Sequence, residues 1–262
     1  MTNVLGKVVA TPEKYSPDLL DPIRRSRNPS MTVFGWDIWH CYELSWCVKN
    51  RIENLVGILS IPANSPAIVE SKSLKLYLNS LNEHRFESRE EAVQIIQGDI
   101  SSRVEAEVTL ICQSPSTLLS ITHDLDGINL PVYPSLETTG KAPLISVSAT
   151  AEQNKFVSET LFSHGLRTLC PVTTQPDWGT LWVTYTGQRL DHSSFARYIS
   201  GYRRHHGFHE ECVEQIFEDV YEAVGPERLQ VVAFYQRRGG LDITPWRSSE
   251  PLAKDIRRLA RQ

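Results

Sequence analysis

Two stretches of the chain carry the same pattern of apolar residues, and this repeat limits the possible folds. In residues 74–96, apolar side chains recur at the spacing expected of two amphipathic helices. Seven of these positions, moved by 121 along the chain, again carry apolar residues. The positions are Leu74, Tyr77, Leu78, Leu81, Ala92, Ile95 and Ile96, and their counterparts are Phe195, Tyr198, Ile199, Tyr202, Val213, Ile216 and Phe217. Both stretches break at matching places, residues 85–88 and 206–209. We therefore expect two modules of one architecture.

Stretches rich in β-branched and aromatic residues flank both predicted helix pairs, which is typical of strands. The predicted strands cover residues 42–47, 52–61 and 104–112 in the first copy, and residues 156–166, 179–185 and 229–236 in the second. Each copy thus has the order strand, strand, helix, helix, strand. This order predicts an α+β fold in which each antiparallel sheet is covered on one face by two helices.

The repeat also predicts how the chain is divided. We assign residues 1–30 to an N-terminal extension and residues 31–115 to the first module. Residues 116–145, in a region rich in Pro, Ser, Thr and Gly, are assigned to a linker, and residues 146–262 to the second module.

Composition excludes several classes of protein. A charged fraction of 22% and a hydrophobic fraction of 40% are ordinary for a soluble domain. A net charge of -4 argues against a long nucleic acid as a direct partner. The sequence has no apolar run near the roughly 20 residues of a membrane span, and no signal peptide. Five cysteines without framework spacing suggest free thiols in a reducing compartment, so we expect a cytoplasmic protein.

Cys170 and Asp177 lie on a short segment that also contains Pro171 and Pro176. Two prolines this close disfavour a regular element, so both side chains are expected on a constrained loop. A thiol needs a group that takes its proton before it attacks, and a nearby carboxylate can do so. Cys170 is therefore a candidate nucleophile, although a buried structural cysteine would give the same pattern.

The start of the last predicted helix holds a second candidate group, Glu210. Acidic residues are favoured at a helix start by the helix dipole alone. A carboxylate there can also accept two N–H donors from the edge of a guanine-like ring. His205, His209 and Cys212 share a helical face, which leaves a zinc site open, but the other thiols lack zinc-ligand spacing.

Two further segments could bind phosphate. Glu70, Ser71 and Lys72 precede a predicted helix, where Ser71 is expected as the N-cap and the helix-start N–H groups can hold an anion. Arg238 and Gly239 follow a predicted strand, as a plain turn or as a phosphate contact. No G-x-G-x-x-G motif occurs, so spacing and composition do not predict a dinucleotide.

Together, four segments resemble the 7-cyano-7-deazaguanine reductases of the queuosine pathway, in their long two-module form. The segments are residues 70–77 (ESKSLKLY), 170–178 (CPVTTQPDW), 208–210 (FHE) and 237–242 (RRGGLD). The resemblance runs from about Trp36 to Trp246. Leu169 and Thr174 depart from the family's usual pattern, which concerns the detail of the loop.

The resemblance implies two tunnelling-fold modules per chain, a site at the seam between them, and a homodimer. It implies that Cys170 attacks the nitrile carbon to form a thioimide while Asp177 relays a proton. Two NADPH molecules per turnover then reduce the adduct to the aminomethyl product, with no metal. The residues implied for the deazapurine substrate are Val69, Glu70, Ser71, His209 and Glu210. Those implied for the cofactor phosphates are Ser71, Lys72, Arg238 and Gly239. Trp178 and Phe208 are candidates to exclude water, which would hydrolyse the thioimide.

Three other functions remain open on the sequence. A nitrile-hydrolysing enzyme can use Cys, Glu and Lys without NADPH. A zinc-dependent cyclohydrolase of the same fold would require a metal. A purine- or pterin-binding module without activity would form no covalent adduct.

Overall fold

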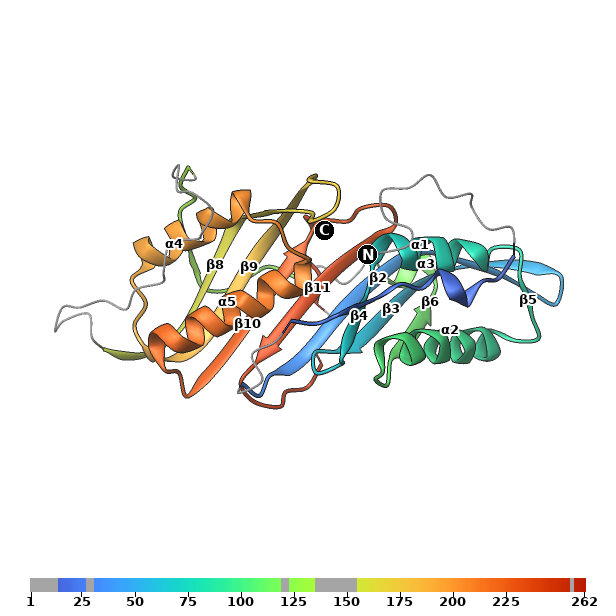
Figure 1. Cartoon of the computed structure of the whole chain (residues 1–262), viewed down its shortest axis with the longest axis horizontal. Helices are drawn as coiled ribbons and strands as arrows, with labels where there is room; N and C mark the ends of the chain where they lie inside the picture. Colours follow the sequence, from blue (N-terminus) through green and yellow to red (C-terminus); the bar gives the residue numbers. More distant parts are fainter. Residues whose placement is uncertain (1–13, 27–30, 119–122, 135–154, 255–256) are drawn as a thin grey trace.

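One sheet of nine strands runs through the parts of the chain that the computed structural model describes, residues 14–26, 31–118, 123–134, 155–254 and 257–262 (Figure 1). Eight strands follow the order β6-β3-β2-β11-β10-β9-β8-β7, and β5 pairs with β2. The pairings are antiparallel except for β7 with β8 and β5 with β2. A separate two-stranded sheet joins β1 to β4. The predicted α+β class is confirmed.

The first half of the chain supplies one end of the sheet. Its elements are the 3-10 turn η1 (Pro17–Leu19), β1 (Pro22–Arg24), β2 (Phe34–Val48), β3 (Arg51–Pro62), β4 (Ala67–Val69), α1 (Ser71–Ser80), β5 (Arg85–Phe86), α2 (Arg89–Val104), β6 (Thr109–Gln113) and α3 (Pro115–Leu118). The strand predicted from residue 104 begins later, because Val104 is the last residue of α2 and is buried with the rest of that helix's apolar side.

The second half repeats this order after the two-residue strand β7 (Ile128–Asn129). Its elements are β8 (Phe156–Leu169), β9 (Pro176–Gln188), α4 (His192–Gly201), the 3-10 turn η2 (Tyr202–Arg204), α5 (His209–Val224), β10 (Arg228–Tyr235) and β11 (Leu241–Ser248). None of the described helices is long and apolar enough to cross a membrane.

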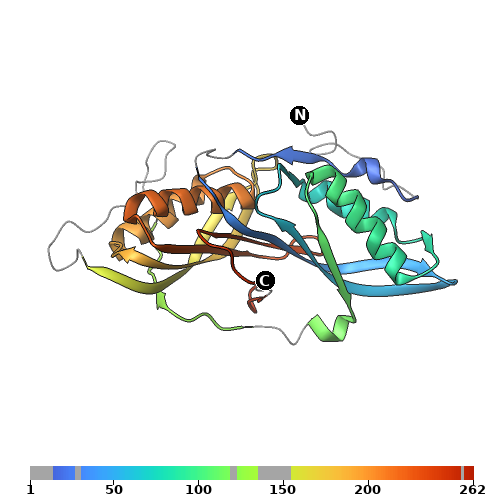
Figure 2. The ribbon, with the colours of Figure 1, turned by 90° about the horizontal axis from the view of Figure 1, so that it is seen from below.

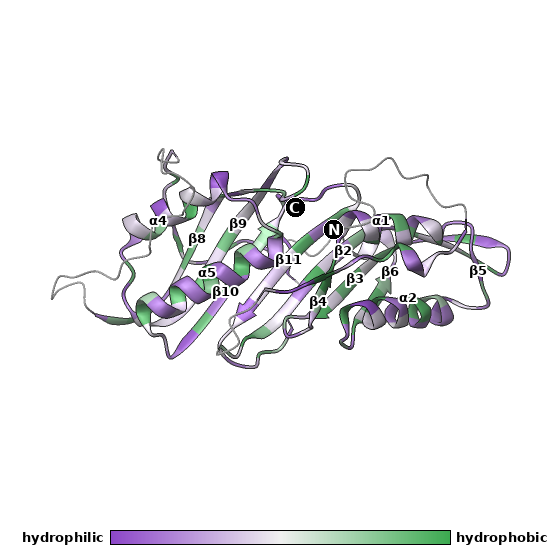
Figure 3. Cartoon of the chain, in the orientation of Figure 1, coloured by the Kyte–Doolittle hydropathy of each residue, from purple (hydrophilic) through white to green (hydrophobic). Residues whose placement is uncertain are grey.

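Both helix pairs lie on the same side of the sheet (Figure 2). The helices alternate between polar and apolar residues along their length, so that one side of each can pack on the strands (Figure 3). Two large apolar clusters result, one under α1 and α2 and one under α4 and α5. A smaller cluster around Ile38, Phe234 and Trp246 lies apart from them. The domain boundaries assigned from the sequence remain a prediction.

The repeat predicted from apolar spacing extends to details of the backbone. Helix α4 begins and ends 121 residues after α1, as the apolar positions require. Strand β2 is irregular between Cys41 and Leu44, and β8 is irregular between Ser163 and Leu166. Each module therefore bends its first strand at an equivalent place.

A buried tyrosine links the two helices of each pair through an aspartate. The hydroxyl of Tyr77 in α1 donates to Asp99 of α2 at 2.6 Å, and Tyr198 in α4 donates to Asp219 of α5. Tyr15, outside the module, also donates to Asp99, at 2.7 Å. Burial is the largest cause that raises the pKa of both module tyrosines, followed by Asp99 for Tyr77 and by Tyr202 and then Asp219 for Tyr198, so both hydroxyls keep their protons as donors.

Strand β11, absent from the sequence prediction, joins the two modules. It pairs with β2 over eight residues, from Leu241 opposite Cys41 to Ser248 opposite Phe34. Pro245 concealed this strand because proline is rare in a central strand. The proline, which has no N–H to donate, is tolerated because the pairing of β11 with β10 ends one residue away, at Trp246 opposite Val232. Pro245 itself is not paired with β10.

Removing one tyrosine hydroxyl should measure the link between helices. We expect Tyr77→Phe to lower the free energy of unfolding by about 1–2 kcal/mol, because it deletes a buried hydrogen bond to a carboxylate. Urea denaturation measures this change. Tyr221→Phe, on a more exposed part of α5, is the control and should change stability by less than about 0.5 kcal/mol. Equal effects in the two variants would contradict the proposed link.

Candidate active site

A cavity of about 200 Å³ lies at the seam on the helix side of the sheet, lined by both halves of the chain. Trp39 of β2 and Ile243 of β11 contribute to its wall, together with the starts of α1 and α5. Nine of the ten residues that the sequence analysis assigned to catalysis, substrate or cofactor line it: Val69, Glu70, Ser71, Lys72, Cys170, Asp177, His209, Glu210 and Arg238. Their proximity is a structural finding, whereas their roles remain predictions.

Cys170 lies on a tight loop between β8 and β9. Its N–H donates to the carbonyl of Gln175 at 2.9 Å, and the N–H of Thr174 donates to the carbonyl of Cys170 at 3.0 Å. Leu169, just before it, exchanges backbone hydrogen bonds with His205 and Gly207, at 2.8 and 3.1 Å. These bonds hold the partly buried free thiol beside the start of α5.

Asp177, expected on the loop, is instead the second residue of β9 and pairs with Thr168 of β8, because Pro176 stands at the first position of the strand, where a proline is tolerated. It also has two partners that the sequence did not predict. Arg238 donates to one carboxylate oxygen, and Nε2 of His209 lies 3.4 Å from the other. Burial by itself would raise the pKa of Asp177, but His209 and then Arg238 outweigh it and lower the pKa. Asp177 is therefore ionised at neutral pH and able to accept a proton.

Arg238, which was predicted to hold a cofactor phosphate, also has partners within the protein. Besides Asp177 it donates to the side-chain oxygen of Gln175. Its side chain remains 40% exposed, so a phosphate can still reach it. The two roles share one side chain.

The two aromatic residues expected to exclude water lie in different places. Phe208 lines the cavity. Trp178 does not line it, and its ring instead contacts the guanidinium groups of Arg167 and Arg203, 5.5 and 5.3 Å from the ring centre. Successive strand residues face opposite sides of the sheet, so a cavity that contains Asp177 excludes its neighbour. The prediction for Trp178 was wrong.

Glu70, and not Ser71, is the N-cap of α1. Its carboxylate accepts the N–H of Lys72 at 2.9 Å and the N–H of Ser73 at 2.8 Å. These helix-start groups are thus already bonded, which corrects the expectation that they would bind a phosphate. Glu70 is 3% exposed and faces the cavity, so its remaining lone pairs can accept further N–H donors.

The two glutamates at the start of α5 have separate functions. Glu211 accepts the N–H of Phe208 at 3.2 Å and so serves the helix start. Glu210 is 3% exposed and lines the cavity. Burial, and then the nearby negative charge of Asp37, raise the pKa of Glu210 to about 7. A ligand that brings N–H donors would favour its ionised form.

A second cavity, of about 730 Å³, contains the remaining predicted residue, Gly239. Lys75 lines both cavities, and sequence analysis quoted it only as part of a motif. Its place one helical turn after Lys72 was the signal that could have identified it. Gly239 has a φ of +56°, a left-handed conformation that favours glycine, and a Cβ there would lie 3.0 Å from Nζ of Lys75.

Among the described residues, no group of three or more His, Cys, Asp or Glu side chains is arranged to hold a metal ion. His205 and Cys212 do approach each other around Gly207, where a Cβ would lie 3.0 Å from Nε2 of His205 and 3.0 Å from Sγ of Cys212. Cys212 is fully buried, and burial raises the pKa of its thiol.

The loop contains one strained residue, Thr174, whose φ is +55°. A β-branched side chain is unfavourable in this conformation. We expect Thr174→Gly to raise the free energy of unfolding by about 0.5–1 kcal/mol, as measured by thermal or urea denaturation. Thr173→Gly, at an ordinary φ, is the matched control and should lower it by a similar amount. Destabilisation by Thr174→Gly would show that the residue is not strained.

Two family models match the chain. One, described as "Nitrile reductase, 7-cyano-7-deazaguanine-reductase N-term", matches residues 11–112, and the other, "QueF-like protein", matches residues 176–254. A partial likeness is also found to the solved structure of the archaeosine synthase QueF-Like in the apo form, with a TM-score of 0.33 and 21% identity over 37% of this chain and 96% of that one.

Curated relatives match over nearly the whole chain. An NADPH-dependent 7-cyano-7-deazaguanine reductase of Acinetobacter baylyi is 42% identical, with 95% of this chain and 93% of the relative covered. A protein of the same name from Paraburkholderia phytofirmans is 42% identical, with 98% and 97% covered. Identity of this extent, together with the matched family models, confirms the resemblance predicted from the four motifs: the chain belongs to the 7-cyano-7-deazaguanine reductase family.

Proposed function

We propose that this chain reduces the nitrile of 7-cyano-7-deazaguanine to the aminomethyl group, using NADPH, as a step of tRNA queuosine biosynthesis. The names of the relatives supply the reaction. The observation that carries the proposal is the meeting of Cys170, Asp177, Glu70 and Glu210 in one cavity. These groups come from distant parts of the sequence, and together they can attack a nitrile and bind a guanine-like ring.

The first step uses the thiol of the loop and the carboxylate of Asp177 at the start of β9. Asp177, ionised because His209 and Arg238 lower its pKa, takes the proton of Cys170 as the sulfur attacks the nitrile carbon. A carbon–sulfur bond forms, one π bond of the nitrile breaks, and the proton passes to the nitrile nitrogen. The product is a thioimide on Cys170.

The later steps release the sulfur. NADPH, when bound, would supply two hydrides, one for each reduction, and each reduction also takes one proton from solvent onto the nitrogen. Between the two reductions the carbon–sulfur bond breaks, the nitrogen gives up one proton as the imine forms, and the sulfur of Cys170 recovers that proton. Asp177 is placed to return it, and Phe208 in the cavity wall helps to keep out water that would hydrolyse the thioimide.

Residues around both cavities fit NADPH. Lys72 and Arg238 supply positive charge at the smaller cavity, and Lys75 borders both. Burial, and then the charge of Arg238, lower the pKa of Lys75, so an anion near it would be favoured. The Cβ-free backbone at Gly239 lets a large group approach closely. Glu43 and Glu83 line the larger cavity too, so its wall carries charges of both signs.

The substrate ring is recognised by carboxylates. Glu210 and Glu70 accept the ring N–H donors, and Val69, Ser71 and His209 adjoin them in the cavity wall. Rings without donors at these positions leave buried carboxylates unpaired and are rejected, often by about 10⁴-fold. We further propose a homodimer in the cytoplasm, where the five free thiols would stay reduced.

Intact-mass spectrometry tests the substrate and nucleophile together. With the cyano substrate and no NADPH, we expect one covalent adduct, since the thioimide cannot be reduced. Cys170→Ala should abolish it, whereas Cys112→Ala, which removes another partly buried free thiol, should leave it intact. An adduct that persists in Cys170→Ala would overturn the assignment.

Cofactor stoichiometry separates reduction from the rival functions. The proposed chemistry consumes about two NADPH per nitrile, because each of two steps needs one hydride. Zero NADPH with a carboxylate product would indicate a nitrile hydrolase. Loss of turnover with a chelator would indicate a zinc enzyme.

The role of Asp177 is tested by a substitution that removes its negative charge and keeps its shape. We expect Asp177→Asn to slow adduct formation by about 10²–10⁴-fold, because general acid–base catalysis is lost, and to leave substrate affinity nearly unchanged. Stopped-flow and equilibrium binding measure the two quantities. Asp126→Asn, at an exposed site, is the control. An unchanged rate would remove Asp177 from the mechanism.

A further inference from the structure

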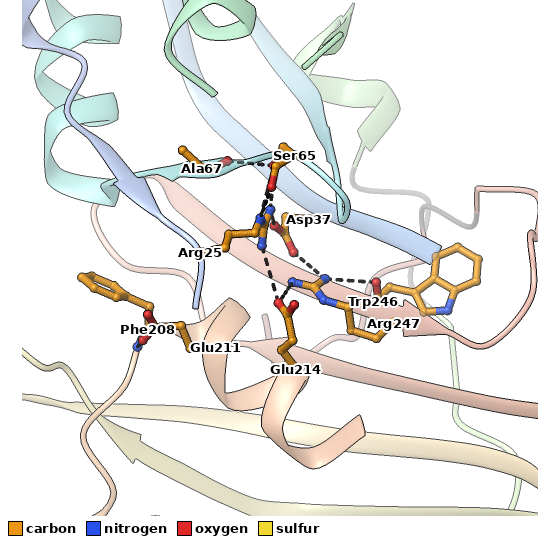
Figure 4. Close-up of polar contacts among 9 residues, drawn as sticks. All are labelled: Arg25, Asp37, Ser65, Ala67, Phe208, Glu211, Glu214, Trp246 and Arg247. Carbon is orange, nitrogen blue, oxygen red and sulfur yellow. Dashed lines mark hydrogen bonds and ion pairs between the residues drawn. The ribbon is translucent and has the colours of Figure 1, made fainter. Parts of the chain in front are cut away.

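Four charged side chains that the mechanism does not use lie buried together at the seam (Figure 4). Arg25 donates to one oxygen of Asp37, and Arg247 donates to the other at 2.8 Å. Glu214 lies 3.5 Å from Arg247 and 4.0 Å from Arg25. All four side chains are at most 6% exposed. Such a cluster is costly to bury, which favours a specific role.

The cluster joins four separate segments. Asp37 belongs to β2 and Arg247 to β11, which pair across the seam. Glu214 belongs to α5, and Arg25 follows the short strand β1 near the N-terminus. Arg25 is further fixed by Ser65, whose carbonyl accepts its Nε–H at 3.1 Å. The N-terminal segment thus supplies a cation to the interior of both modules.

Glu214 connects the cluster to the candidate active site. It lies four residues after Glu210, on the same face of α5. The contact between Glu214 and Arg247 therefore fixes the rotation of α5 on β11, and with it the direction of the Glu210 side chain.

The charges of the cluster balance without Glu210. The two positive charges of Arg25 and Arg247 equal the two negative charges of Asp37 and Glu214. An ionised Glu210 would therefore be an additional buried negative charge. Burial, and then Asp37, raise the pKa of Glu210 to about 7, while His209 and Arg25 act in the opposite direction. The charged and titratable groups of the elements around it are Asp37, Arg247, Arg25, His209, Glu211, Cys212, Glu214, Glu70, Lys72 and Asp177.

We propose that Arg25, Asp37, Glu214 and Arg247 are positioning residues that aim Glu210 into the cavity and set its charge for the N–H edge of the substrate. This inference rests on the proposed function in one respect, that Glu210 receives that edge. Because the ring donates hydrogen bonds, only ionised Glu210 binds it well. Substrate affinity should therefore rise as pH increases through about 7.

Two substitutions of opposite charge test the cluster. Arg25→Gln removes a cation and should move the midpoint of the pH dependence of KM upward by about one pH unit. Asp37→Asn removes an anion and should move it downward by a similar amount. In both, kcat at high pH should change much less than KM. Merely structural damage would not shift the midpoint in opposite directions.

Matched controls separate charge from folding. Arg25→Lys keeps the charge and should keep the midpoint near its wild-type value. Arg24→Gln removes the adjacent arginine, which is 69% exposed, and should leave the midpoint unchanged. If Asp37→Asn does not fold, Glu214→Gln serves in its place, with the same downward shift expected.

A measurement without substrate separates this inference from the proposed function. The pKa of Glu210 is higher in the folded protein than its usual 4.5, so its contribution to stability is complete below about 4.5 and is lost as pH rises through about 7. We would measure melting temperature against pH for the wild type and each cluster variant, with and without the added substitution Glu210→Gln. The difference within each such pair isolates the contribution of Glu210.

The pH at which the Glu210 contribution is lost should rise in Arg25→Gln and fall in Asp37→Asn. These opposite shifts would support the cluster's control of Glu210 even if the wild type reduced no nitrile. A wild type that reduces no nitrile would defeat only the proposed function. Shifts in the same direction, or none, would overturn the inference even in an active nitrile reductase. So would a KM that does not change with pH between 6 and 8.

Discussion

The antiparallel pairing of β2 with β11 is the interaction on which the rest of the structure depends. It turns two modules into one sheet and brings Trp39 and Ile243 side by side at the cavity. The starts of α1 and α5 converge above this pair of strands, and the buried charges of Asp37 and Arg247 stabilise it from the same side. Without the pairing, the two halves of the cavity would have no fixed relation to each other.

Apolar spacing predicted the helices well and strand β11 not at all. Apolar spacing is a local signal, and the burial of Leu74, Tyr77, Phe195 and Tyr198 follows it closely. Strand β11 depends on a partner some two hundred residues earlier in the chain, and Pro245 argued against a strand. Long-range pairing of this kind leaves no periodic trace in a short window.

The candidate site was predictable in its members but not in its contacts. Pro171 and Pro176 marked the segment that joins Cys170 to Asp177, and motif resemblance supplied Glu70 and Glu210. The contacts of Asp177 with His209 and Arg238 bring together three distant segments, which spacing alone cannot indicate. Arg25 carried no signal, because a single arginine in a charged segment is usually solvated.

The equivalent helix starts of the two copies have taken on different tasks. Glu70 caps α1 and faces the cavity, whereas Asp191, at the matching place in the second copy, caps α4 by accepting the N–H of Ser194 at 2.7 Å. Ser88 likewise caps α2, where the second copy has the residues that open α5. Separate identical subunits would have to keep every such position the same. Fusion into one polypeptide allows each half to specialise, and here the second half supplies Cys170 while the first supplies Glu70 to the wall of the same cavity.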